Sequence, residues 1–356
     1  MSSLLRGQTA NGFRQSVFQF TQKRSWSART IPSFYPTASP ELDKALNRFR
    51  DEVFVPHSLN TEQKRMIYKQ RFADKLRENP ITVSIGPKDE PYLLRPIDVE
   101  ALPSRQDAYA ALYLMFEAKN WSNLPLFLTG LYNANRKISR TRWEWLIRKA
   151  GQSNGLGALL QCAQTPKETH FWLKDTEIVK KLFLQLHLLA LEGVSSEPDV
   201  EKAHRLATQF ALQMETDAHA VNSLEKDPRK SPFVIGALLE LNAAYALQEP
   251  SKEQGAEVLK FAQRFLASWE PPVQPSADAK WALIDELLQE IVMSYNGMLL
   301  ALRVPEISKA QDVSKGLRER VAEYGTFIKK LKKMAPAKVV ENPTLGFKQA
   351  TLLHKE

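Results

Sequence analysis

Apolar side chains recur at helical spacing through almost the whole chain from Ser104 onward. In the first such segment, Leu112 and Met115 fall on one face of a helix, and Ser104 stands where a capping residue would begin it. A later segment that begins at Asp175 is apolar nearly all round, which predicts a central, buried helix. This pattern restricts residues 104–335 to a helical body.

The predicted helices form hairpins joined by short loops. Three successive helix starts, near Ser104, Ser139 and Asp175, are 35 and 36 residues apart, close to the period of helix-turn-helix repeats. No shared residue signature accompanies this spacing, so true repeats and irregular packing both remain open. The chain has only 14 glycines, which disfavours a glycine-rich α/β nucleotide fold. We therefore predict an all-α fold, an irregular α-solenoid-like array of helical hairpins.

The pattern is less regular between residues 41 and 103. This stretch begins polar and helix-prone, and then Ile81, Val83 and Ile85 alternate with polar residues, which is the period of a half-buried strand. A run of Gly, Pro and Asp follows and favours a turn. We predict an N-terminal helical region that leads into a short extended or β-hairpin arm between Pro80 and Pro103.

The first forty residues contain five Arg or Lys and no acidic residue. This composition is typical of a mitochondrial targeting segment, and residues 24–27 (Arg-Ser-Trp-Ser) resemble a processing site. A disordered basic tail is the alternative. The net charge of the chain is +9, so only 9 − 5 = +4 remains from Glu41 onward. We predict a targeting segment and linker over residues 1–40 and a location in the mitochondrial matrix.

Residues that would support catalysis or metal binding are sparse and poorly spaced. Cys162 is the single cysteine, and the six histidines are scattered without the spacing of a zinc site. Residues 151–155 match the G-x-S-x-G pattern of hydrolases, but that pattern needs a preceding strand, and here a helix precedes it. We expect no enzyme activity, metal, cofactor or small-molecule substrate. No apolar run of about twenty residues occurs, so we expect no membrane span.

Two basic clusters are the candidate RNA-binding residues. Their cations would neutralise phosphates, and the nearby Trp143 and Trp145 could stack on unpaired bases if exposed. The alternative is that Trp143 belongs to the core and the charges form a solvated face. The first cluster consists of Arg136, Lys137, Arg140, Arg142, Arg148 and Lys149. The second consists of Lys329, Lys330, Lys332 and Lys333.

The second cluster ends the last predicted helix, and residues 336–356 follow it. Lysines at a helix C-terminus complement the helix dipole, but four of them exceed that need. We predict that residues 336–356 form an extended tail, whose spaced apolar residues would lie in grooves of a large partner. Those apolar residues are Leu345, Phe347, Leu352 and Leu353.

In its architecture the chain resembles the accessory proteins of fungal mitochondrial ribosomes. The resemblance is carried by residues 54–57 (Phe-Val-Pro-His), the arm over 80–103, and residues 143–146 (Trp-Glu-Trp-Leu). It implies a structural component of the mitochondrial ribosome that contacts ribosomal RNA and neighbouring ribosomal proteins. The hairpin spacing is also similar to that of pentatricopeptide-type RNA-binding proteins. The alternative function is a mitochondrial helical-repeat adaptor or an RNA-binding expression or assembly factor.

Overall fold

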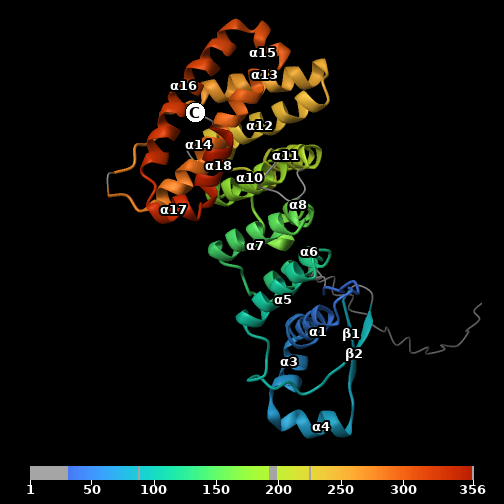
Figure 1. Ribbon diagram of the computed structural model, residues 1–356. Coiled ribbons are helices and arrows are strands. Elements are labelled where there is room, and N and C mark those ends of the chain that lie inside the picture. The colour runs from blue at the N-terminus through green and yellow to red at the C-terminus, as the bar shows by residue number, and fades with distance from the viewer. Residues whose placement is uncertain (1–30, 87–88, 192–198, 224–225, 277, 355–356) are drawn as a thin grey trace, which may run out of the picture.

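Regular structure in the part of the chain that the structure describes is almost entirely helical, with one small two-stranded sheet near the N-terminus (Figure 1). The all-α fold with a β-hairpin arm is therefore confirmed. The predicted processing site lies outside the described residues, and cleavage there stays a prediction. The computed structural model describes residues 31–86, 89–191, 199–223, 226–276 and 278–354.

The helices of the body stack in two rows along an elongated molecule (Figure 1). In the first row each helix packs on the next, and in the second row α6 contacts α8, which contacts α11. This arrangement is the expected solenoid-like array. The first row consists of α5 (Arg105–Glu117), α7 (Arg140–Gln152), α10 (Thr176–Ala190), α12 (Pro232–Gln248) and α14 (Trp281–Ala301). The second row consists of α6 (Leu124–Asn133), α8 (Leu156–Gln164), α11 (Val200–Met214) and α13 (Lys252–Ala267).

Side-chain caps define where several of these helices begin. The Ser104 hydroxyl accepts the backbone N–H of Asp107 at 3.2 Å, and the Asp107 carboxylate accepts the N–H of Ser104 at 2.6 Å. This reciprocal pair satisfies two donors that a helix start otherwise leaves without partners. The Asp175 carboxylate similarly accepts the N–H of Glu177 at 3.0 Å. Both helix starts agree with the positions that the sequence predicted.

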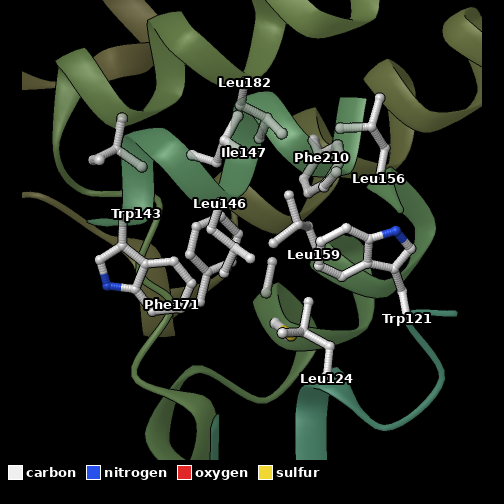
Figure 2. Packing of buried hydrophobic residues seen from close by; sticks show 14 of the residues in the cluster. Trp121, Leu124, Trp143, Leu146, Ile147, Leu156, Leu159, Phe171, Leu182 and Phe210 are labelled. Carbon is white, nitrogen blue, oxygen red and sulfur yellow. The ribbon is translucent and has the colours of Figure 1, made fainter. Parts of the chain in front are cut away.

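The first hydrophobic core runs from the N-terminal helices to α12, and α10 lies within it (Figure 2). Leu182 of α10 is fully buried in this core with Leu146, Leu159 and Phe210. The buried positions of α10 run without a break from Leu182 to His187. A helix buried on so many sides must lie centrally, as the all-round apolar pattern predicted.

A second core lies among α12, α13, α14 and two further helices, α15 (Pro305–Lys309) and α16 (Gln311–Lys333). Leu288, Val292 and Met298 of α14 are fully buried in it. Because α12 contributes residues to both cores, it joins the two parts of the stack.

The N-terminal region folds as short helices and a hairpin at one end of the stack (Figure 1). The hairpin strands pair antiparallel, with Thr82 opposite Leu93. Phe49 and Phe54 pack against Phe127 of α6, with ring centroids 5.2 and 5.9 Å apart. Its elements are α1 (Pro40–Phe49), a π-helical turn (Arg50–Phe54), α2 (Val55–Ser58), α3 (Thr61–Tyr68), α4 (Ala73–Glu78), β1 (Thr82–Ile85) and β2 (Glu90–Leu93).

The prediction of an extended C-terminal tail is wrong. This region forms α17 (Ala337–Glu341) and α18 (Leu345–Leu353), and α18 packs on α14. The Asp285 carboxylate of α14 accepts the N–H of Phe347 at 3.0 Å and also bonds the Thr344 hydroxyl. Leu353 packs on the chain's own second core, and the Phe347 ring lies 6.1 Å from the Trp281 ring of α14, between centroids, so α14 supplies both apolar surface and the cap for this segment.

Candidate RNA interface

Helix α7 positions most of the first basic cluster. Trp143, Leu146 and Ile147 are buried on its inner face, so its charged residues occupy the flank and the outer face. The Trp143 ring lies 4.8 Å from the Phe171 ring, between centroids. Trp143 is only 8% exposed and cannot stack on a base, so the alternative in which Trp143 belongs to the core is the correct one for this residue. Trp145 is only half-buried.

Two cations of α7 lie against aromatic rings of α5. The Arg142 guanidinium is 4.0 Å from the centroid of the Tyr109 ring, and the Lys149 ammonium is 4.1 Å from that of Phe116. Tyr113 lies on the same helix, 5.8 Å from Phe116 between centroids, and is 47% exposed. Rings attract these cations through their quadrupoles without cancelling the formal charge. The result is a surface strip in which positive charge alternates with accessible ring.

The α5 rings were not among the predicted site residues. Tyr109, Tyr113 and Phe116 recur at i, i+4 and i+7, which places them on one face of a helix. This spacing is itself a signal that sequence reasoning could have used. It could not show that the face lies beside the cations of α7, because that juxtaposition comes from stacking of the hairpins.

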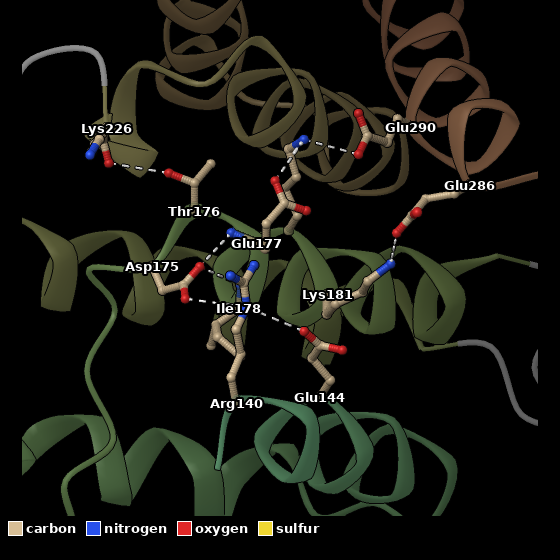
Figure 3. Close-up of polar contacts among 11 residues, drawn as sticks. Arg140, Glu144, Asp175, Thr176, Glu177, Ile178, Lys181, Lys226, Glu286 and Glu290 are labelled. Atoms are coloured by element: carbon tan, nitrogen blue, oxygen red, sulfur yellow. Dashed lines mark hydrogen bonds and ion pairs between the residues drawn. The ribbon is translucent and has the colours of Figure 1, made fainter. Parts of the chain in front are cut away.

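The remaining cations of the first cluster differ in whether they already have a partner within the protein. Arg140 is paired with Glu144 at 3.4 Å and with Asp175 at 3.5 Å (Figure 3). Arg136 donates to the backbone carbonyl of Pro103, and its burial lowers the pKa of its guanidinium. Lys137 and Arg148 are exposed.

The second cluster lies at the C-terminal end of α16. Ile328 and Leu331 are fully buried, so the lysines between and after them project away from the second core. Lys330 donates to the side-chain oxygen of Gln274 at 2.7 Å. The two clusters are on separate elements, because α16 packs on α14 whereas α7 packs on α10.

Most of the predicted RNA-binding cations have no carboxylate partner within the described residues. Such side chains keep their full charge for an external anion. This group consists of Arg136, Lys137, Arg142, Arg148, Lys149, Lys330, Lys332 and Lys333.

Charge is also divided by region along the sequence. Residues 104–175 carry ten Lys or Arg against five Asp or Glu, a net charge of +5, and residues 311–356 carry the same numbers. Residues 176–310 carry 13 basic and 19 acidic residues, a net charge of −6. The basic clusters therefore lie in the two positive regions, which flank a negative one.

The G-x-S-x-G match has a structural explanation. Ser153 is buried at the end of α7, where its hydroxyl donates to the Lys149 carbonyl at 2.8 Å and accepts the Trp121 indole N–H at 3.0 Å. Burial raises the pKa of the Cys162 thiol. Across the described ranges no group of three metal-ligating side chains occurs, and no helix there is long and apolar enough to cross a membrane.

Comparison with known proteins identifies the family. The family model described as mitochondrial ribosomal protein mS27 (Mrp13) matches residues 18–352. The chain belongs to the mS27 family of mitochondrial ribosomal proteins. One relative within the curated proteins is the small ribosomal subunit protein mS27 of Neurospora crassa, which is 26% identical over 260 residues. That match covers 67% of this chain and 65% of the relative's length.

Membership of the mS27 family confirms the resemblance to fungal mitochondrial ribosomal proteins. It supports a structural ribosomal role over an adaptor or assembly factor. The family model extends across both basic clusters, the α5 rings and most of α18.

Proposed function

We propose that this protein is a structural component of the small subunit of the mitochondrial ribosome, located in the matrix, and that it has no catalytic activity. Family membership carries this proposal, and the name of the Neurospora relative supports the choice of the small subunit. The acid-free first forty residues support import, with removal of roughly the first 26 residues. N-terminal sequencing of the protein from mitochondria tests the import step, because an intact Met1 would contradict it.

We further propose that both basic clusters contact ribosomal RNA. Eight of the ten predicted cations have no carboxylate ion-pair partner in the described chain, so binding phosphate would not require them to break an ion pair. The α5–α7 strip adds half-buried and exposed rings beside Arg142 and Lys149, which suits an unpaired base next to its phosphate. Neighbouring ribosomal proteins are the remaining partners.

Salt-dependent assembly tests the RNA contacts. In one variant Lys137, Arg142, Arg148 and Lys149 are changed to Gln, and in a second variant Lys329, Lys330, Lys332 and Lys333 are changed to Gln. Removal of each phosphate contact should reduce the slope of log affinity against log salt by about 0.7–0.9. Binding to small subunits that lack the protein is measured by sedimentation at increasing KCl.

The matched control changes four exposed lysines of the negative region to Gln: Lys226, Lys252, Lys280 and Lys309. We expect the control to keep the salt slope of the unaltered protein. If both cluster variants also keep that slope, the clusters are solvated faces and the RNA proposal fails. If no version sediments with small subunits, the assignment to the ribosome fails.

A further inference from the structure

A groove opens on the second row of helices, between α11 and α13. Both helices pack on α12, and a hollow of about 360 Å³ lies between them. Its apolar lining includes Ala211 and Leu212 of α11, Leu238 of α12 and Phe261 of α13. Leu212 is 55% exposed, so its side chain offers apolar surface at the edge of this hollow.

One wall of the groove is preformed. The His204 ring stacks on Tyr245 with 4.3 Å between centroids and an interplanar angle of 10°. His204 Nε2 lies 3.2 Å from the side-chain oxygen of Asn242, whose amide donates to the Leu238 carbonyl at 2.7 Å. These contacts fix the side chains of α11 and α12 against each other, so a ligand would bind without first ordering this wall.

Carboxylates border the groove. Glu215 is paired with Arg229 at 2.8 Å, and Glu257 is paired with Lys260 at 3.3 Å. Glu253 is exposed and has no ion-pair partner within the described residues.

The cations that line the groove already have partners within the protein. Lys260 is the partner of Glu257. The Arg264 guanidinium lies 5.5 Å from the centroid of the Phe261 ring and donates to the Arg229 carbonyl at 3.4 Å. The groove also belongs to the region with a net charge of −6. An RNA phosphate would meet carboxylates here, whereas a basic peptide would find a charge partner in Glu253.

We propose that this groove binds a short segment of a neighbouring protein, in which an apolar side chain packs on Leu212 and Phe261 and an adjacent Lys or Arg residue pairs with Glu253. An apolar anchor in a preformed pocket with charges at the rim is a common form of peptide recognition. This inference uses the proposed function only because the ribosomal particle supplies the partner. It assigns protein to the negative region and leaves RNA to the two positive ones.

Photo-crosslinking in the assembled particle tests the groove. The full-length protein carries p-benzoylphenylalanine at position 212 in place of Leu, is incorporated into small subunits and is irradiated. We expect a cross-link to one protein, and mass spectrometry should place it in a segment with Lys or Arg beside an apolar residue. A cross-link to RNA, to an acidic segment, or to no partner would overturn the proposal.

The control places the same photoprobe at position 273, where Val is 81% exposed and outside the groove. We expect that probe not to give the segment cross-linked from position 212, and the same segment from both positions would contradict a groove-specific contact. A protein that sediments with small subunits but gives no protein cross-link from position 212 refutes the groove alone. A protein that does not sediment refutes the proposed function instead.

A charge variant separates specific binding from proximity. With the photoprobe at position 212, Glu253→Lys should reduce the yield of that cross-link severalfold, and Glu253→Gln should reduce it less. The neighbouring exposed Lys252→Gln is the matched control and should not reduce it. Because Glu253 is exposed, its variants should fold normally, which circular dichroism checks. An unchanged cross-link yield in Glu253→Lys would contradict a basic partner.

Discussion

Helices α7 and α10 are neighbours in the same row and both carry cations, yet those cations have different surroundings. On α10, Lys180 reaches Glu290 of α14 at 3.0 Å. Lys181 pairs with Glu286 of the same helix α14 (Figure 3). On α7, Arg142 and Lys149 meet aromatic rings of α5 instead of carboxylates. The α10 lysines therefore act within the fold, whereas the α7 cations keep charge for an external partner.

The electrostatics of the α10 pair support a structural role. Burial by itself lowers the pKa of Lys180, but the carboxylates of Glu290 and Glu177 outweigh it and leave that pKa raised. The ammonium is thus stabilised by groups 110 and 3 residues away in sequence. A basic residue becomes a candidate RNA ligand only when no such partner packs against it.

The largest expected effect is on the free energy of unfolding and concerns the core in which α10 packs on α7 and α12. Leu182→Ala should lower the free energy of unfolding by about 2–5 kcal/mol, because it leaves a cavity at a fully buried position. Urea denaturation followed by circular dichroism measures the change. The exposed Leu212→Ala is the control and should stay within about 0.5 kcal/mol. Equal midpoints for the two variants would show that α10 is not central.

The same substitution of one lysine on each helix, Lys180 on α10 and Lys149 on α7, tests whether their cations have different roles. The Glu290 side chain is only 30% exposed, and Lys180→Gln removes its lysine partner. This substitution should lower the free energy of unfolding by about 1–2 kcal/mol and should leave the salt dependence of RNA binding unchanged. Lys149→Gln should cost no more than about 1 kcal/mol, the value of its ring contact, but should reduce the salt slope by about 0.7–0.9. Denaturation and salt titration are measured on both variants. An equal change in the salt slope for Lys180→Gln and Lys149→Gln would contradict the different roles assigned to the two helices.

Some helices could be predicted from the sequence, and others could not. The helices of the body were predictable because each carries its own apolar period, and Ser104 and Asp175 cap them locally. The helical state of α18 was not, because its cap, Asp285, lies 62 residues from Phe347 and its apolar partners are on α14. Without that partner, the spaced apolar residues near the C-terminus indicated an extended tail.

For the candidate site, the sequence predicted the types of residue but not their surroundings. Sequence indicated basic clusters beside tryptophans, and the structure places Trp143 in the core and substitutes the α5 rings as neighbours. It also separates Arg140, which is paired with carboxylates, from Arg148, which is exposed. Which charge is neutralised depends on contacts between hairpins, and no local pattern encodes those contacts.

Acidification distinguishes the ionic contacts between α10 and α14 from the hydrogen bonds of His219, a residue that follows α11 and links α8 to the segment before α10. His219 Nδ1 accepts the N–H of Leu173 at 3.0 Å, and Nε2 donates to the Ala163 carbonyl at 2.8 Å, so the ring is neutral. Burial lowers the pKa of His219 below its ordinary 6.5, and Lys174 lowers it further. The unfolded state then binds more protons, so the stabilisation is complete above pH 6.5 and is lost as pH falls through the lowered pKa.

We expect His219→Gln to remove about 0.5–1.5 kcal/mol at pH 7.5, the usual net value of a hydrogen bond, and to flatten the loss of stability below pH 6.5. His170 and His204 also have lowered pKa values and should leave a residual pH dependence. Denaturation midpoints between pH 7.5 and 5.0 measure both effects. If the denaturation midpoints of the variant and of the unaltered protein fall in parallel as the pH is lowered, His219 does not contribute to the pH dependence of stability.

The smallest expected effect concerns Arg140, which lies between the two cases. It belongs to the predicted RNA cluster, yet it is paired with Glu144 and Asp175. Its side chain is 54% exposed, so solvent screens both pairs, and Arg140→Gln should change stability by no more than about 0.5 kcal/mol. Its charge is already shared with two carboxylates, so the salt slope should also fall less than in Arg148→Gln, the exposed control on the same helix. A full reduction of about 0.7–0.9 in slope for Arg140→Gln would mean that RNA displaces the carboxylates, and an internal ion pair would then no longer identify a structural cation.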